Sequence, residues 1–419
     1  MALKYRLRLL TAATVAAVCA LPYGAKTALA AQVSVERTST GWQLLVDGKP
    51  YVVKGVNYTP FKIGESPHNN TLRDWMIIDD DGDGRIDAAF QSWVDKNRND
   101  IRDDDEPAVG DFQLLKEMGA NTIRIFHHPS GDPEIIALHP NNLDLNHPPN
   151  KELLRRLHAD YGIRVIMGDF LGAYTVGSAA AWRDGTDYTD PVQRENMLKS
   201  VEAMVREFKD EPYLLMWTLG NANNDAATAK TNAAQQPKAF AEFVNTVVRR
   251  IHELDTDHPV ALVNGDTDLL PVYARYAPDI DILGINTTRY QPGFGSLWQE
   301  AAQVYDKPVL ITSYGPPAMR FVDGRFDEIY QYRVHVAGWR DIARHTADGG
   351  LPGNAIGGVA FEWLDAWWRD YRPLEHNLGK HGWHAEWQGI AAQGGGDQSL
   401  FLRQLRHVYY AYQALWTED

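Results

Sequence analysis

Acidic residues between positions 79 and 106 follow the spacing of a calcium-binding loop. The first set comprises Asp79, Asp81, Asp83, Gly84, Ile86 and Asp87. These residues match positions 1, 3, 5, 6, 8 and 9 of a twelve-residue calcium loop, where alternating oxygens surround the ion. Position 12 is Phe90, which cannot bind a metal. The pattern predicts a Ca²⁺ site that lacks the usual final carboxylate.

A second set with the same spacing follows it. Its candidate ligands are Asp95, Asn97, Asn99, Asp103 and Glu106. Glu106 falls at position 12, where a bidentate carboxylate belongs. Position 6 is Asp100 instead of glycine, and Asp tolerates the turn conformation required there. Ca²⁺ takes six to eight oxygen ligands, so the two sets together predict one or two bound ions.

The alternative to a metal site is a solvated acidic loop. Residues 79 to 106 contain eleven acids and four bases, and charge runs of this kind are commonly exposed. A bare loop has no reason to keep the alternation together with Gly84 and Ile86. Helices that flank a regulatory calcium loop are not evident in the sequence, so we expect structural Ca²⁺.

Polar and aromatic residues recur where short apolar runs end. They are Asn57, Tyr58, Arg124, His127, His128, Asp169, Asn221, Asp266, Asn286, Thr287, Ser313, Tyr314, Glu362 and Trp363. Side chains of these types bind hydroxyl-rich ligands or transfer protons. Any one of them can instead cap a loop, and this reading stays open for Asp266 and Asn286.

The apolar runs themselves alternate with amphipathic helical stretches. The runs are Tyr51–Tyr58, Asn121–His127, Arg164–Phe170, Tyr213–Asn221, Pro259–Asp266, Asp281–Thr287, Lys307–Tyr314 and Ala355–Asp365. The helices are expected at Asp111–Met118, Lys151–Tyr161, Pro191–Lys209, Pro237–Leu254, Ser296–Tyr305, Asp327–Thr346 and about 399–415. Eight strand–helix units predict a (β/α)8 TIM barrel, whose active site lies at the carboxyl ends of its strands. An open doubly wound sheet is the alternative to the barrel, and it is disfavoured because no glycine-rich phosphate motif follows the first strand.

Two features flank the first strand. Before it, Asp47-Gly48 between Trp42–Val46 and Tyr51–Val53 predicts a β-hairpin that caps the closed end of the barrel. After it, the insertion of about 60–110 is much longer than an ordinary strand–helix loop and carries the calcium-type sets.

Several strand motifs resemble the catalytic barrel of retaining β-glycosidases. They are Lys54-Gly55-Val56-Asn57-Tyr58, Asn121-Thr122-Ile123-Arg124, Leu219-Gly220-Asn221, Lys307-Pro308-Val309-Leu310-Ile311-Thr312 and Phe361-Glu362-Trp363. The sequence is most similar to the barrel domain of glycoside hydrolase family 2 and more distantly to fungal β-1,3-glucanosyltransferases. The resemblance implies a two-carboxylate retaining mechanism, with one acid/base and one nucleophile.

Both carboxylates implied by the resemblance are replaced. The acid/base position after Leu-Gly-Asn is Ala222, and the nucleophile position before Tyr314-Gly315 is Ser313. A methyl group cannot protonate a glycosidic oxygen, and a serine without an adjacent base is a poor nucleophile. Further departures are Thr287, Thr288 and Ala366, where relatives carry aromatic or acidic residues. Ordinary retaining hydrolysis should be close to absent.

The binding residues of the family are better retained. The resemblance assigns Asn221 to the 2-hydroxyl of the sugar, Arg124 to the nucleophile position and Trp363 to the floor beneath one sugar ring. The expected substrate-binding set is Asn57, Tyr58, Arg124, His127, His128, Asp169, Asn221, Tyr314, Glu362 and Trp363. Packing of Trp363 with Trp367 and Trp368 in a core is the alternative for that residue.

Three explanations of the replaced carboxylates remain open. The protein is a glycan-binding pseudoenzyme, a disabled variant of an active parent, or an enzyme with displaced carboxylates. The candidates for displaced carboxylates are Asp169, Asp225, Glu362 and Asp365. The first two explanations are favoured because a displaced pair must recover a narrow geometry.

The first thirty residues predict a secretory signal peptide. Lys4, Arg6 and Arg8 precede an apolar run from Leu9 to Leu21, and Ala28-Leu29-Ala30 suits a cleavage site. The single cysteine, Cys19, lies inside this segment without the flanking residues of a lipid-anchor site. The remaining chain, 31–419, is expected to be a single secreted or periplasmic domain without disulfides or a membrane span.

The composition of the chain restricts the classes of partner that it can bind. The formal net charge is −14, and a nucleic-acid partner would need a clustered basic surface. The 13 Trp and 19 Tyr can supply platforms for sugar rings, although most must pack in the core. We expect a secreted glycosidase-type barrel that acts on or binds a β-linked glucan-type polysaccharide, with impaired catalysis. Alternatives are a non-catalytic glycan-binding protein and a structural protein of a polysaccharide export system.

Overall fold

A computed structural model describes residues 30–139, 148–320, 323–370, 372–376 and 385–417. Its centre is a closed barrel of eight parallel strands in the order β10-β11-β12-β4-β6-β7-β8-β9. The strands are β4 (Val53–Asn57), β6 (Thr122–Arg124), β7 (Arg164–Asp169), β8 (Leu214–Leu219), β9 (Val260–Gly265), β10 (Ile282–Asn286), β11 (Val309–Tyr314) and β12 (Ala355–Ala360). The predicted (β/α)8 barrel is confirmed. The signal peptide predicted at 1–30, with Cys19, lies outside the described residues except for Ala30.

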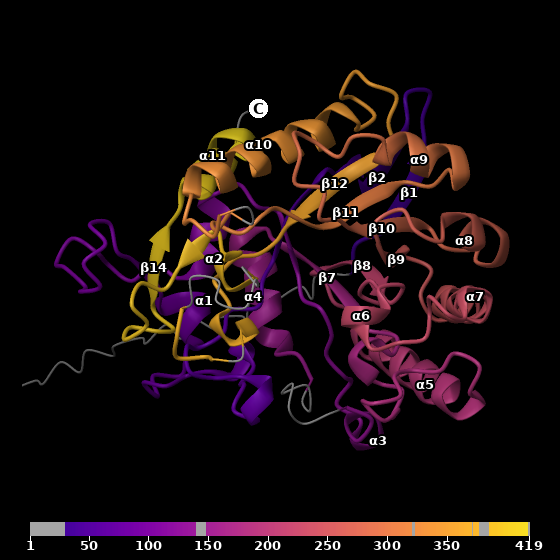
Figure 1. The fold of residues 1–419 in the computed structure, drawn as a ribbon, viewed down its shortest axis with the longest axis horizontal. Helices are drawn as coiled ribbons and strands as arrows, with labels where there is room; N and C mark the ends of the chain where they lie inside the picture. The colour runs from indigo at the N-terminus through magenta and orange to yellow at the C-terminus, as the bar shows by residue number, and fades with distance from the viewer. Residues whose placement is uncertain (1–29, 140–147, 321–322, 371, 377–384, 418–419) are drawn as a thin grey trace, which may run out of the picture.

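Helices cover the outside of the barrel. They are α2 (Asp111–Glu117), α3 (Pro133–Ile136), α4 (Lys151–Tyr161), α5 (Pro191–Phe208), α6 (Ala226–Ala229), α7 (Pro237–Leu254), α8 (Leu270–Tyr276), α9 (Leu297–Val304), α10 (Glu328–Arg344) and α11 (His407–Thr417). In Figure 1, α5, α7, α8 and α9 lie along one side of the strands. Among the described residues, no helix is both long and apolar enough to span a membrane.

Local signals set the helix ends where they were expected. The Asp190 carboxylate accepts hydrogen bonds from the amides of Val192 and Gln193, and Pro191 occupies the first turn of α5. Asn150 caps α4 in the same way, and Gly162 ends that helix with a φ of 74°. These caps satisfy backbone groups that a helix end would otherwise leave without a partner.

An N-terminal sheet closes one end of the barrel. It comprises β1 (Val33–Arg37), β2 (Trp42–Val46) and β3 (Lys49–Pro50), and the β2–β3 turn is Asp47-Gly48. The second strand of this hairpin is therefore 49–50 and not 51–53, because Val53 already pairs with Gly357 in the barrel. The apolar side chains of β1 and β2 pack on the amino-terminal ends of the barrel strands. The opposite end of the barrel forms the mouth.

The insertion after β4 is tied to the C-terminal part of the chain. It contains α1 (Asp87–Gln91) and β5 (Trp93–Val94), and β5 pairs with β14 (Leu402–Leu405), which pairs with β13 (Ala391–Ala392). The helix predicted from about 399 therefore begins only at His407, because 402–405 extend to form this sheet. Similarly, the last barrel strand ends at Ala360 instead of Asp365.

Candidate active site at the barrel mouth

A hydrogen-bond network joins five strands at the mouth. Nη1 of Arg124 donates to Asn57 Oδ1 (3.5 Å) and to the carbonyl of Thr312 (3.2 Å), and Nη2 donates to Asn221 Oδ1 (3.3 Å). Asn286 donates to the same Asn221 oxygen at 3.0 Å and accepts from the Thr312 hydroxyl at 2.9 Å. Side chains that lie far apart in sequence thus converge where the barrel fold places active sites.

The two positions assigned to catalysis flank this network. Ala222 follows Asn221, and Ser313 follows Thr312 on β11. Both residues are partly exposed, and Asn286 links their neighbours through one hydrogen bond on each side. Ala222 has a φ of 56°, in the left-handed region that side chains rarely adopt. The predicted placement of these positions at the mouth agrees with the structure, and their chemical roles stay predictions.

Glu362 and Arg369 form an ion pair beside the mouth. Arg369 Nη2 lies 2.9 Å from Glu362 Oε2, whereas Glu362 Oε1 is buried without a hydrogen-bond partner among the described residues. Burial raises the pKa of Glu362 to about 7, and the opposing effect of Arg369 offsets it only in part. A carboxyl group with this pKa can hold or release a proton near neutrality. Glu362 therefore has a pKa closer to neutrality than that of Asp169, another of the four candidate carboxylates.

The other candidates for displaced carboxylates have different roles. Asp365 pairs with buried Arg406 and accepts from the amide of Gly389. Asp169 accepts from the amide of Leu171 and the hydroxyl of Ser200, and burial raises its pKa to about 6. Asp225 is exposed and caps α6. In these contacts Asp169 and Asp365 accept hydrogen bonds that hold neighbouring segments together.

Several predicted binding residues are buried and bonded elsewhere. Tyr58 donates to Asp111 and packs on Trp75. His127 Nε2 lies 2.6 Å from His139 Nε2, and His128 lies 3.4 Å from Asp74. Tyr314 accepts a hydrogen bond from the Tyr412 hydroxyl. The structure does not bring these four side chains into the Arg124 network.

Trp363 does not offer a platform to a ligand. Its side chain is 0% exposed and belongs to the main hydrophobic core, near Tyr409. The expectation of a sugar floor is therefore wrong for this conformation, and the core-packing alternative describes it. The strand ends at Ala360, so Trp363 lies on the segment after the strand and not within it.

Other aromatic residues lie at the mouth instead. The Arg369 guanidinium lies over the Phe361 ring (4.7 Å) and the Trp368 ring (5.2 Å), and both rings are partly exposed. Tyr174, in a short helical turn after β7, accepts a hydrogen bond from Asn221. Tyr174, Trp368 and Arg369 were not predicted as site residues. The Trp367-Trp368-Arg369 run is a sequence signal for two of them, whereas Tyr174 has none.

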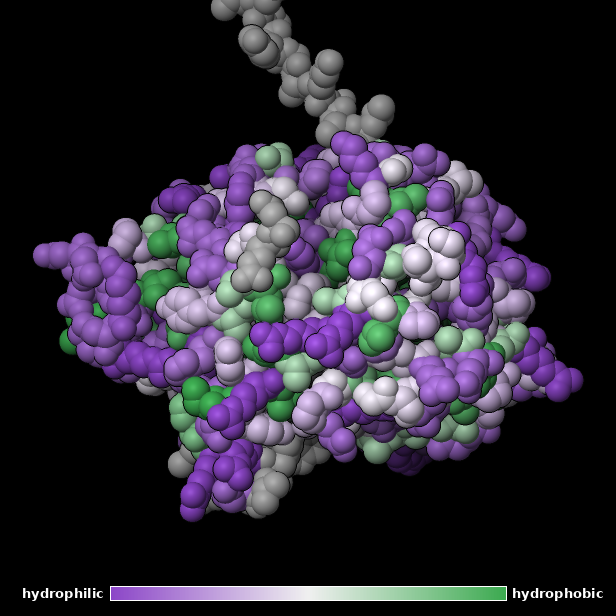
Figure 2. Space-filling model, turned by 90° about the horizontal axis from the view of Figure 1, so that it is seen from above, coloured by the Kyte–Doolittle hydropathy of each residue, from purple (hydrophilic) through white to green (hydrophobic). Residues whose placement is uncertain are grey.

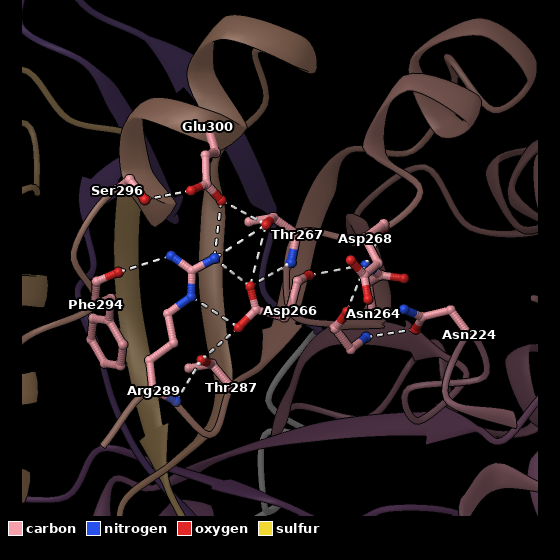
Figure 3. A network of polar contacts seen from close by, with 11 residues as sticks. Asn224, Asn264, Asp266, Thr267, Asp268, Thr287, Arg289, Phe294, Ser296 and Glu300 are labelled. Carbon is pink, nitrogen blue, oxygen red and sulfur yellow. Dashed lines mark hydrogen bonds and ion pairs between the residues drawn. The ribbon is translucent and has the colours of Figure 1, made fainter. Parts of the chain in front are cut away.

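A separate polar network ties the ends of β9 and β10 (Figure 3). Arg289 makes two hydrogen bonds to the Asp266 carboxylate and one, of 3.0 Å, to Glu300. Burial alone would raise the pKa of Asp266, but hydrogen bonds from Arg289 and Thr287 hold it below its ordinary value. Asp266 is therefore an ionised structural residue, as the capped-loop alternative proposed for it.

The two acidic sets in the insertion share one backbone geometry. In the first set, Asp79 accepts from the amides of Asp83 and Gly84, and Asp83 accepts from the amide of Arg85. In the second set, the corresponding residues Asp95 and Asn99 accept from amides at the same relative positions. Side-chain oxygens of Asp79, Asp81 and Asp87 lie within 4.8 Å of one another.

Comparisons with known proteins show which barrels this one is similar to. Residues 135–333 match the family model described as "Glycosyl hydrolases family 2, TIM barrel domain". The β-glucuronidase of Mus musculus is 23% identical over 310 residues, which cover 70% of this chain and 36% of that protein. The chain thus spans about a third of the length of the curated relatives it matches.

Solved structures show the same fold. The β-glucuronidase of Bacteroides uniformis superimposes with a TM-score of 0.55 at 16% identity, covering 92% of this chain and 37% of that one. A calcium-binding mutant of Bacteroides uniformis β-glucuronidase 2 gives a TM-score of 0.50 at 16% identity, covering 91% and 36%. The chain therefore contains a (β/α)8 barrel that is similar, over residues 135–333, to the TIM-barrel domain of glycosyl hydrolase family 2.

Proposed function

We propose that the barrel mouth binds a β-linked saccharide and that hydrolysis of it is impaired. The observation that carries the proposal is the intact polar network of Asn57, Arg124 and Asn221 between two positions that lack carboxylates. Hydrogen-bond donors and acceptors that converge at the strand ends are suited to sugar hydroxyls. Ala222 and Ser313 supply neither the acid nor the nucleophile of a retaining glycosidase.

Two saccharide classes are compatible with this mouth. The glycosidase resemblance favours a β-glucan. The relatives are named β-glucuronidases, and Arg124 and Arg369 both lie near Tyr174 at the mouth, which favours a β-glucuronide. The partial exposure of Asn221, Ala222 and Ser313 supports binding over a purely structural role. On the face seen in Figure 2, hydrophobic residues form small separate groups among hydrophilic ones.

Binding should depend on the aromatic side chains at the mouth. We expect Trp368→Ala to weaken saccharide binding about three- to tenfold, on the order of the roughly 0.5–1.5 kcal/mol that an aromatic pair contributes beyond its buried area. Titration calorimetry with β-glucan and β-glucuronide oligosaccharides measures the change. Tyr410→Ala is the matched control, because Tyr410 is an exposed aromatic residue on α11. The absence of binding heat with every member of the panel would refute the proposed function.

We also propose that the insertion binds Ca²⁺. Acids at expected ligand positions, Asp79, Asp81, Asp87 and Asp95 among them, form no ion pair with the residues that the structure describes. Neighbouring Asp80 and Asp105, which are not ligand positions, do pair with Arg73 and Lys96. Burial and nearby acids raise the pKa of Asp87, as expected for a cluster whose charge a cation would offset. The calcium-binding mutant of a β-glucuronidase with this fold is consistent with the proposal.

Removal of calcium should lower stability. An ion bound only to the folded state stabilises it by mass action, so excess chelator is expected to lower the thermal midpoint by about 3–8 °C. Asp79→Ala and Asp95→Ala should reduce the response to added Ca²⁺, whereas Asp184→Ala, an exposed acid elsewhere, should not. An unchanged midpoint in chelator, together with no metal by elemental analysis, would rule the site out.

Export is proposed from residues 1–30 alone. A basic start, a short apolar run and a small-residue cleavage site suit secretion to a periplasm or the medium. Mass spectrometry of the protein recovered outside the cytoplasm tests this directly, because the mature chain should begin near Ala31.

A further inference from the structure

Three arginines are among the largest fully buried side chains, and they differ in their partners. Arg403 makes two hydrogen bonds to the Asp111 carboxylate, of 2.7 and 2.9 Å. Arg406 makes two to the Asp365 carboxylate. Arg124 is equally buried but makes no ion pair with any described residue. Arg403 and Arg406 thus each pair with a buried carboxylate, whereas Arg124 does not pair with a described one.

The partners of Arg124 are neutral groups. They are the oxygens of Asn57, Asn221 and the Thr312 carbonyl, which lie 3.2 to 3.5 Å from its nitrogens, and the Phe126 ring, whose centre lies 4.6 Å from the guanidinium carbon. Its Nε has no hydrogen-bond partner among the described residues. Charge-assisted hydrogen bonds from a guanidinium are ordinarily shorter, about 2.7–2.9 Å. Burial lowers the pKa of Arg124 to about 9, and Tyr174 opposes this effect only in part. A buried cation without an anion is costly, because little offsets its lost hydration.

Two partners of Arg124 adjoin partly exposed residues at the mouth. Thr312, whose carbonyl it contacts, precedes partly exposed Ser313, and Asn221 precedes partly exposed Ala222. Serine and alanine are small, so this edge of the network is not closed by a long side chain. Glu362, a buried carboxyl in the segment after the last barrel strand, pairs with Arg369. No described carboxylate is therefore placed to neutralise Arg124.

We infer that the mouth binds a carboxylate-class monoanion against Arg124, beside Ser313. Planar carboxylates match the two-pronged donor geometry of a guanidinium. Two sources supply this chemistry: a free small carboxylate such as formate or acetate, or the carboxylate of an acidic sugar. The second source rests on the saccharide binding proposed above, whereas the first does not.

The first experiment uses the whole protein and acetate at pH 7. Acetate is expected to raise the thermal midpoint by about 2–5 °C relative to chloride at equal ionic strength. Ser313→Ala should retain the response, because it leaves Arg124 free. Ser313→Glu should abolish it and raise the midpoint without acetate, because its own carboxylate occupies the place. Ser313→Gln, of nearly equal size but neutral, should not raise the midpoint.

Two results would overturn the inference. One is an acetate effect of equal size in Ser313→Glu, and the other is no acetate effect in the wild type. Arg124→Met serves as an additional variant if it folds, and it should lose the acetate response entirely. The Ser313 series keeps the test decisive even if that variant does not fold.

Calorimetry with methyl β-D-glucuronide and methyl β-D-glucoside separates the two sources. Glucuronide binding at least tenfold tighter than glucoside binding, and competitive with acetate, assigns the site to a sugar carboxylate. Equal binding of both glycosides alongside acetate assigns it to a free anion. Equal binding of both with no acetate effect refutes the anion site and leaves the saccharide proposal standing. If neither glycoside binds but the acetate response still depends on the residue at position 313, the saccharide proposal is refuted and the anion site stands.

Discussion

The double variant Ala222→Glu/Ser313→Glu is expected to hydrolyse aryl β-glycosides at least about 10³-fold faster than the wild type. Glu at 313 would attack the anomeric carbon, and Glu at 222 would protonate the leaving oxygen and later activate water. A retaining pair must lie about 5–5.5 Å apart. Asn286 bridges Asn221 and Thr312, the neighbours of the two positions, which supports a short separation.

The single variants should behave differently from the pair. An aryl glycoside with a good leaving group needs little acid assistance, so Ser313→Glu alone should give a burst of released aryl alcohol and then slow turnover. Ala222→Glu alone should stay inactive, because no nucleophile is present. The left-handed backbone at Ala222, with a φ of 56°, is the main obstacle, at about 1–2 kcal/mol for a longer side chain.

Controls separate the charge of the new residues from their size. Ala222→Gln/Ser313→Gln introduces side chains of similar volume without acid or nucleophile, and it should stay silent. Glu362→Gln in the wild-type background tests whether that buried carboxyl sustains any residual activity. A folded double-Glu variant that cleaves no aryl β-glycoside would show that the assignment of positions 222 and 313 is wrong or that the site geometry has been lost.

Asp111→Ala is expected to destabilise the protein by about 3–5 kcal/mol, because it leaves the buried Arg403 charge without a partner. The Asp111 carboxylate also accepts hydrogen bonds from Tyr58 and Ser92. It thereby joins the residue that follows strand β4, the insertion, helix α2 and strand β14. Loss of one carboxylate should loosen the contact between the insertion and the C-terminal part of the chain.

Urea unfolding measures this effect through the transition midpoint and slope. Asp105→Ala is the control within the same insertion, since Asp105 pairs with Lys96 but is 78% exposed in its side chain. Exposed ion pairs contribute about 0–1 kcal/mol, so this variant should unfold close to the wild type. Equal midpoints for Asp111→Ala and the wild type would contradict the role assigned to the buried pair.

The barrel was predictable because its signals are local. Each run of apolar residues ends in or next to a polar or aromatic residue, as Arg164–Phe170 does at Asp169, and helices such as α4 and α5 carry their own caps. Because the eight strands of the barrel run parallel, their carboxyl ends all lie at the same end of the barrel. For that reason Asn57, Arg124 and Asn221 could be expected to lie together, and the structure joins them through hydrogen bonds.

Pairings between distant segments could not be predicted in this way. The contact of β5 with β14 joins Trp93 to Leu402, and neither short segment forms a recognisable strand alone. The second strand of the hairpin was misplaced for a related reason, because Val53 pairs in the barrel and not with β2. Strand partners depend on which edges remain free once the whole sheet has closed.

The direction of each side chain at the mouth was also decided by the tertiary structure. The sequence placed Trp363 near the end of the predicted last strand, 355–365, as a floor for a sugar ring, but packing buries its side chain in the core. Arg369, which the sequence did not single out, pairs with Glu362. Likewise, the resemblance implied that two carboxylates are replaced, and only the fold showed that Arg124 is buried with no ion-pair partner in the described part of the chain. Residue types are fixed by the chain, whereas burial and charge pairing arise from contacts between segments far apart in it.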